Sequence, residues 1–87
     1  MKYEIKYNFK DGHTYTIPVP INTNINKIRY MAIESYYERN NVTSMVIIGD
    51  GKTKGKIGIV KGKKTTFTWT NSRGQKTGLN NDGTLKR

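Results

Sequence analysis

The first residues of the chain alternate between apolar and polar side chains, and this alternation constrains the fold more than any other feature. On one side of segment 2–9 lie four apolar or aromatic residues: Tyr3, Ile5, Tyr7 and Phe9. On the other side lie four polar residues: Lys2, Glu4, Lys6 and Asn8. A period of two is typical of a β-strand that buries one face. We therefore expect a strand over 2–9 and a hairpin at Asp11-Gly12.

The faces of the two strands decide the length of this hairpin loop. A two-residue loop would pair Phe9 with Thr14 and mix the two faces. A three-residue loop, Lys10-Asp11-Gly12, keeps apolar residues opposite one another and places Gly12 at the left-handed position of a bulge. Because a one-residue slip is costly where one face is buried, we predict the longer loop. The expected pairs are Phe9 with His13, Tyr7 with Tyr15, Ile5 with Ile17 and Tyr3 with Val19.

One helix is predicted after this hairpin. Pro18 and Pro20 indicate that the second strand lies at a sheet edge or ends there. Asn22-Thr23-Asn24 offers helix N-caps, and Asn40-Asn41 is a plausible helix end. Apolar side chains then recur at helical spacing: Ile25, Ile28, Ala32 and Tyr36. This spacing predicts a helix over about 24–39.

Two or three strands are expected after the helix. Val42–Ile48 is a short apolar run, 49–55 is expected to be a flexible loop, and 57–60 forms a further short strand. In the last strand Phe67 and Trp69 share one face, and three threonines share the other: Thr66, Thr68 and Thr70. Residues 71–87 have only two large aliphatic side chains. We therefore expect a single α+β domain over 1–70 and a flexible basic tail over 71–87.

The order of hairpin, helix and further strands resembles the β-grasp arrangement of ubiquitin-like and immunoglobulin-binding bacterial domains. The resemblance covers roughly 2–70 and is one of layout, without a shared motif. It implies that the first and last strands lie side by side in parallel, and that the helix packs on one face of a mixed sheet. The strand near 57–60 is additional to the simplest version. The resemblance assigns no functional residue, because a fold does not imply a function.

Positive charge is concentrated in the second half of the chain. Residues 51–87 contain ten Lys and Arg against one acid, Asp82, and so carry nine of the net charge of +10. Most of these cations lie in segment 51–76, which reads as a hairpin with cationic loops. Lysines on Gly-rich loops neutralise phosphates, and aromatic side chains stack on bases. The candidate nucleic-acid contacts are Lys52, Lys54, Lys56, Lys61, Lys63, Lys64, Trp69, Arg73 and Lys76. Trp69 and Phe67 have an alternative role as core residues.

The sequence offers few residues for catalysis or for metal binding. The chain has no cysteine and a single histidine, His13, which excludes thiolate sites and histidine clusters. Gly51-Lys52-Thr53 resembles the end of a P-loop, but position 46 is Val where that motif needs glycine. Glu34 and Glu38 are most simply a solvated helix face. We therefore expect no enzyme, no cofactor and no metal, with a ribonuclease that uses Lys, Arg and Tyr as the remaining catalytic alternative.

The sequence also predicts a compartment. The N-terminal segment MKYEIKYNFK lacks the apolar core of a signal peptide. No run approaches the ~20 apolar residues of a membrane span. The absence of cysteine suits a reducing compartment. These features together predict a cytoplasmic protein that does not associate with membranes.

Two functional hypotheses follow, with a third in which the charge only maintains solubility. The first is a small non-enzymatic nucleic-acid-binding protein that contacts phosphates through segment 51–76. The second is a protein-binding inhibitor or regulator that docks on an acidic protein or nucleoprotein, such as a nucleic-acid-handling or anti-phage defence complex. Small Lys- and Asn-rich chains are common in phages and mobile elements, which fits either hypothesis.

Overall fold

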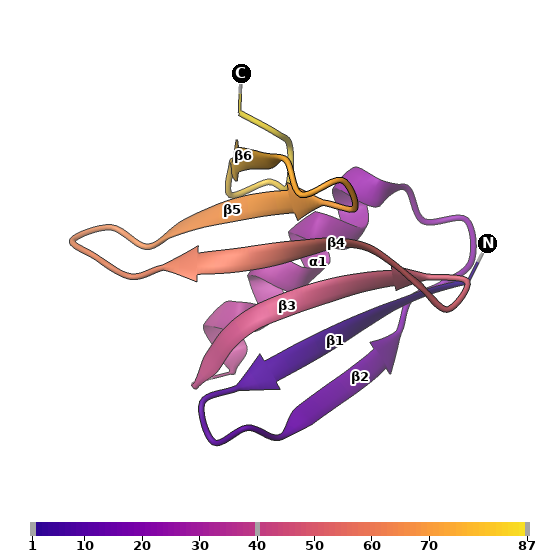
Figure 1. The fold of residues 1–87 in the computed structure, drawn as a ribbon, viewed down its shortest axis with the longest axis horizontal. Helices are drawn as coiled ribbons and strands as arrows, with labels where there is room; N and C mark the ends of the chain where they lie inside the picture. The colour runs from indigo at the N-terminus through magenta and orange to yellow at the C-terminus, as the bar shows by residue number, and fades with distance from the viewer. Residues whose placement is uncertain (1, 40, 87) are drawn as a thin grey trace.

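The computed structural model describes residues 2–39 and 41–86. Its elements follow the order β1 (Tyr3–Phe9), β2 (Thr14–Pro18), α1 (Ile25–Glu38), β3 (Val42–Gly49), β4 (Lys52–Val60), β5 (Thr66–Asn71) and β6 (Lys76–Leu79). The six strands form one sheet, and α1 lies across one side of it (Figure 1). This arrangement confirms the predicted α+β domain. Among the described residues, no helix is long and apolar enough to cross a membrane.

Every strand pair in the sheet is antiparallel, in the order β2-β1-β3-β4-β5-β6. The parallel pairing of first and last strands, and with it the mixed sheet, was therefore wrong. The difference is that β3, the first strand after α1, takes the place beside β1, and β4, β5 and β6 follow outward in chain order. Fourteen residues at 1.5 Å each span about 21 Å, so α1 carries the chain once along the sheet. Val42 then pairs with Phe9 at the far end of β1, and β3 runs back antiparallel to β1.

The N-terminal hairpin has the predicted register. Tyr7 pairs with Tyr15, and Ile5 pairs with Ile17. The amide of Phe9 donates to the carbonyl of His13 at 3.0 Å, and Gly12 has a φ of 93°. The three-residue loop is thus confirmed, and β2 lies at the edge of the sheet as Pro18 indicated.

Helix α1 begins and ends close to the predicted positions. The side chain of Asn24 caps it, because its Oδ1 accepts from the amide of Lys27 at 2.9 Å. The face turned toward the sheet buries Ile28, Ala32 and Ile33. Burying these side chains against the sheet gives the helix most of its stability, since short isolated helices are marginal in water.

The core lies between α1 and the face of the sheet that carries the aromatic side chains. The largest fully buried members are Tyr7, Phe67, Ile5, Ile28, Ile33, Met45, Ile47, Ile57, Leu79 and Val42. Ile5 pairs with Ile47, and Met45 pairs with Ile57, so apolar side chains continue from strand to strand. Most apolar residues are gathered on this side, so the other side of the sheet carries mainly polar residues, with Val46, Ile48 and Val60 as aliphatic members.

The predicted flexible loop over 49–55 was wrong, because β4 already begins at Lys52. Residue Gly55 explains why this segment forms a strand. It lies directly against the Trp69 ring, in a place where a Cβ atom would overlap Cζ2 of the indole. The glycine is therefore needed for strand packing rather than for chain flexibility.

The predicted boundary at residue 70 does not separate a domain from a tail. Strand β6 pairs with β5, and Leu79 is 1% exposed opposite Phe67. After β6 the chain turns at 80–84, and Leu85 forms a bridge with Leu79. Gly83 meanwhile packs on the backbone of α1 near Asn26. Segment 71–86 thus completes one edge of the domain.

Candidate polyanion-binding surface

The side of the sheet opposite α1, which we term the open face, is not covered by any element of the described chain. Figure 1 looks directly onto it, with α1 behind the strands. Strand registers identify the residues that share this face, because directly paired residues point to the same side of a sheet. No aromatic residue is among them. Glu4 is the single acidic residue.

Three lysines form a line across the open face, which we term the lysine row: Lys6, Lys56 and Lys76. Lys6 pairs with Val46, and Val46 pairs with Lys56. Lys56 in turn pairs with Thr70, and Thr70 pairs with Lys76. Successive lysines are therefore two strands apart, or about 10 Å at the usual strand spacing. The row crosses most of the sheet, over about 19 Å.

A second line of small polar residues runs beside the lysine row. Its members are Thr14, Asn8, Ser44, Gly58, Thr68 and Gly78. Asn8 Nδ2 donates to the hydroxyl of Ser44 at 3.0 Å. The two glycines carry no side chain of their own, although the side chain of Lys86 lies over Gly78. From Asn8 to Thr68 this line is consequently a low, hydroxyl-bearing strip beside taller lysines, which lets an extended polyanion approach the backbone.

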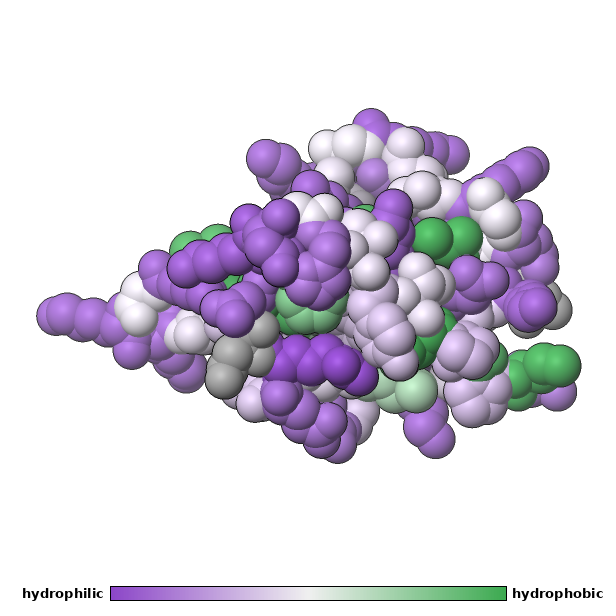
Figure 2. Space-filling model, turned by 90° about the horizontal axis from the view of Figure 1, so that it is seen from below, coloured by the Kyte–Doolittle hydropathy of each residue, from purple (hydrophilic) through white to green (hydrophobic). Residues whose placement is uncertain are grey.

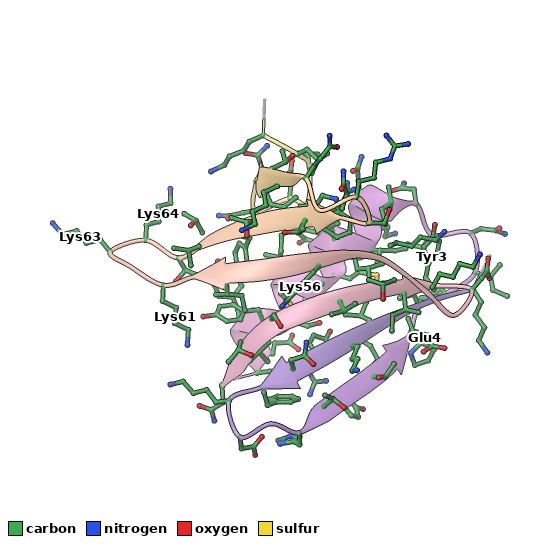
Figure 3. The ribbon with its side chains drawn as sticks, viewed as in Figure 1. Tyr3, Glu4, Lys56, Lys61, Lys63 and Lys64 are labelled. Atoms are coloured by element: carbon green, nitrogen blue, oxygen red, sulfur yellow. The ribbon has the colours of Figure 1, made fainter. Side chains whose placement is uncertain are left out.

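The connection between β4 and β5 supplies a second cationic group. We term residues 60–66 the hairpin tip. It carries three exposed lysines: Lys61, Lys63 and Lys64. In Figure 3 these lysines stand at the end of the β4–β5 ribbon, with Lys63 pointing outward and Lys61 and Lys64 pointing to opposite sides, while Lys56 lies over the middle of the sheet. Figure 2 shows the hydrophilic tip as a narrow projection from the body of the molecule.

All acidic residues except Glu4 lie away from the open face. Glu34 and Glu38 are exposed on α1, behind the sheet. The remaining acids outside β1 lie in turns: Asp11, Asp50 and Asp82. Glu4 alone is on the open face, two residues along β1 from Lys6 of the lysine row. The open face and the hairpin tip therefore present a cationic surface to solvent.

The structure separates the predicted contact residues into groups. It brings Lys56 and Lys76 together on the open face, and it places the three lysines of the hairpin tip at one end of the sheet. Lys52 and Arg73 lie at the other end, in or beside the turns that precede β4 and β6. The stem of Lys54 packs near Gly49 on the side of α1.

Trp69 is part of the core and 4% exposed. Its ring lies under the guanidinium of Arg29 and against Gly55. Phe67 is 1% exposed and contacts Tyr36 edge-on. Phe67 and Trp69 are both core residues, as the alternative prediction stated. The face of β5 that carries them is turned toward α1. In this position Trp69 has no free ring face for stacking on a base.

Two lysines of this surface, Lys6 and Lys86, were not predicted from the sequence. Lys6 was placed on the polar side of its strand but was not linked to the basic segment, because only the antiparallel β1–β3 pairing connects them. Lys86 lies over Gly78, where a Cβ atom would be 3.0 Å from its Cδ. A hollow of about 220 Å³ lies between Lys86 and Lys64, lined also by Asn80, Asn81 and Thr66. The alternation in 2–9 was the available signal for Lys6.

The aspartates Asp11 and Asp82 are engaged in turns. The backbone amide of His13 lowers the pKa of Asp11, and the hydroxyl of Thr84 lowers the pKa of Asp82. Within residues 2–39 and 41–86, no three His, Cys, Asp or Glu side chains are grouped as metal ligands. The arrangement is suited to holding negative charge by multiple lysine contacts.

No protein-family model, curated protein or solved structure matches this chain.

Proposed function

We propose that this protein binds nucleic acid without catalysing a reaction on it, and that the lysine row and the hairpin tip contact phosphates. The observation that carries this proposal is the alignment of Lys6, Lys56 and Lys76 across an uncovered sheet face with one acidic residue. These lysines come from three strands that are distant in sequence. Each phosphate they neutralise releases counterions, which favours binding at low salt.

The span of the row suits a nucleic-acid backbone. About 19 Å corresponds to five or six base pairs at 3.4 Å each. The strip of small residues beside the row leaves room for sugar and phosphate groups, and its hydroxyls donate to phosphate oxygens. The open face has no side chain that would read a base by stacking. Binding through this face is therefore expected to depend little on sequence.

Fluorescence anisotropy with labelled single- and double-stranded DNA and RNA, over a salt series, tests the proposal. We expect micromolar or tighter binding to at least one probe at about 0.15 M salt. The triple variant Lys6→Ala/Lys56→Ala/Lys76→Ala should reduce the slope of log affinity against log salt by about 2 to 3 on a duplex. Absence of binding to all four probes would contradict the proposal.

A matched pair of single variants separates surface position from net charge. Lys56→Ala and Lys27→Ala remove one exposed lysine each, from the open face and from α1 respectively. We expect Lys56→Ala to reduce the salt slope by about 1 and Lys27→Ala to leave it nearly unchanged. Equal effects of the two variants would point to overall charge instead of a defined surface.

The edge strand β2 favours a second candidate function, docking on an acidic protein or nucleoprotein. Thr14–Pro18 contains no charged side chain, and β2 has a neighbour on one side only. Such an edge can add to a partner's sheet through main-chain hydrogen bonds. This candidate predicts that the purified protein ignores bare nucleic acid and co-elutes with one partner.

A further inference from the structure

We infer that the nucleic acid bound by this surface is B-form duplex DNA, with the hairpin tip in the major groove and the lysine row on phosphates beside it. This inference rests on the proposed function and specifies its ligand.

The hairpin tip stands out from one end of the sheet (Figure 1). The β3–β4 ladder ends at Ser44 paired with Gly58, and the β5–β6 ladder ends at Phe67 paired with Leu79. The β4–β5 ladder continues to Val60 paired with Thr66. Beyond this pair, the connection of residues 61–65 lies outside the ladders, and Figure 1 shows it standing out past the ends of the neighbouring strands. Three residues from Val60 to Lys63 span at most about 10 Å, at 3.3 Å each.

The size of this projection matches the major groove of duplex DNA. The major groove of B-DNA is about 12 Å wide and 8.5 Å deep and admits a two-stranded β-ribbon. The minor groove, at about 6 Å, is too narrow for two strands about 4.8 Å apart with their side chains. The projecting length of the tip is close to the depth of the major groove. The geometry thus selects the major groove.

The side chains of the tip carry hydrogen-bond donors that suit the floor of the major groove. Ammonium groups of Lys61, Lys63 and Lys64 are donors suited to guanine O6 and N7, which are acceptors at the floor of the major groove. Val60 is 52% exposed on the open face, although it is a large apolar residue. Val60 lies at the root of the tip, so it stays at the mouth of the groove while the lysines reach toward its floor. The tip therefore offers hydrogen-bond donors to the acceptors of the groove floor.

A polar hollow lies at the root of the tip. The hollow between Lys64 and Lys86 is lined also by Asn80 and Asn81, and Asn80 Nδ2 donates to the hydroxyl of Thr84 at 2.9 Å. Two cations beside one polar hollow suit a phosphate group. A phosphate of the groove wall lies beside a ribbon that enters the groove. The hollow is positioned to receive that phosphate.

Other nucleic acids fit less well. Single-strand binding relies on exposed aromatic platforms, and the large aromatic residues that are exposed, Tyr15, Tyr30 and Tyr37, lie on the edge strand or on α1. A-form RNA has a deep, narrow major groove that side chains do not read. We therefore expect duplex DNA to bind at least about tenfold more tightly than duplex RNA or single-stranded DNA at the same salt.

Methylation footprinting with dimethyl sulfate tests the position of the tip. Guanine N7 lies in the major groove and adenine N3 in the minor groove, so one reagent reports both. On a saturated duplex we expect protection of guanine N7 with adenine N3 still reactive. Two triple variants with equal charge loss then separate the tip from the row.

Lys61→Ala/Lys63→Ala/Lys64→Ala should abolish N7 protection. Lys6→Ala/Lys56→Ala/Lys76→Ala should weaken binding but retain the protection when the duplex is saturated. All six side chains are solvent-facing, and a thermal melt checks that both variants fold.

Each outcome distinguishes the two proposals. Unprotected guanine N7 in a saturated complex, protected adenine N3, or equal affinity for single strands and duplex would overturn groove insertion and leave nucleic-acid binding intact. Absence of binding to every probe would overturn both.

Discussion

The guanidinium carbon of Arg29 lies 4.3 Å from the centroid of the Trp69 ring, and both side chains are buried. Burial lowers the pKa of Arg29. The Nη1 group of Arg29 donates to Asn26 Oδ1 at 2.8 Å, while the indole face supplies a site for the desolvated cation. This contact fastens α1 to β5 and fixes Trp69 on the helix side of the sheet.

The only tryptophan of the chain therefore reports on the core. We expect its fluorescence emission to lie at shorter wavelength than that of a solvated indole. Emission should not change when duplex DNA saturates the protein, as judged by anisotropy in the same sample. Strong quenching on binding would mean that Trp69 contacts the ligand, in conflict with its burial.

Substitution of Gly55 should destabilise the fold. In Gly55→Ala the new Cβ overlaps the six-membered ring of Trp69, and overpacking of this kind costs about 1–3 kcal/mol. Gly62→Ala is the matched control, since a Cβ there meets no atom within 4 Å. Urea denaturation should show a lower midpoint for Gly55→Ala alone. Equal midpoints would disprove the close Gly55–Trp69 contact.

Gly83 tests whether the C-terminal turn belongs to the domain. In Gly83→Ala the Cβ would lie 2.5 Å from the carbonyl oxygen of Asn26, on a backbone with φ of 90°. Gly12 has a similar φ of 93° but open space around it, so Gly12→Ala isolates the backbone strain. We expect a loss of about 1 kcal/mol at Gly12 and about 2 kcal/mol more at Gly83. A loose C-terminal segment would give the reverse order.

Removing the one acid of the open face should strengthen binding. Glu4 opposes the approach of phosphates beside the lysine row, so Glu4→Gln should raise duplex affinity about two- to fivefold at low salt, with the gain shrinking as salt rises. Glu38→Gln, on exposed α1, makes the same change of charge away from this face. Comparable gains from both variants would argue against contact through the open face.

The turn at 80–84 should show a pH signature. Thr84 lowers the pKa of Asp82 through its hydroxyl first and its amide second. The charged carboxylate therefore stabilises the turn above its unfolded pKa of about 3.9, and this contribution is lost as pH falls through the folded value. Carboxyl NMR titration of Thr84→Val should shift the Asp82 midpoint upward. The midpoint of Asp11 should be unaffected by this variant.

Local patterns in the sequence were sufficient for the elements whose partners are near in the chain. Alternation around Tyr7 and the turn at Gly12 predicted the first hairpin with its register, and apolar spacing predicted α1. The pairing of β1 with β3 was not predictable in this way, because local patterns do not decide which of the later strands lies beside β1. Leu79 likewise lies in a segment whose sequence has few apolar residues. Only its position opposite Phe67 makes it a core residue.

The candidate site shows the same division. The charge of segment 51–76 was evident from composition, and the hairpin tip followed from it. The lysine row was not evident, because Lys6 joins Lys56 and Lys76 only through the registers of four neighbouring strand pairs. Trp69 could not be assigned to core or surface from alternation, since the covered face of the sheet depends on the position of α1.

The strand order also has a consequence for how fast the chain folds. Four of the five strand pairings join strands that follow one another directly, while β1–β3 joins strands separated by β2 and α1. Hairpins close in microseconds, whereas contacts between distant segments require a longer loop to be ordered first. Formation of the β1–β3 ladder, where Ile5 meets Ile47, is therefore the step expected to limit folding. The hairpin from β4 to β5 forms without waiting for it.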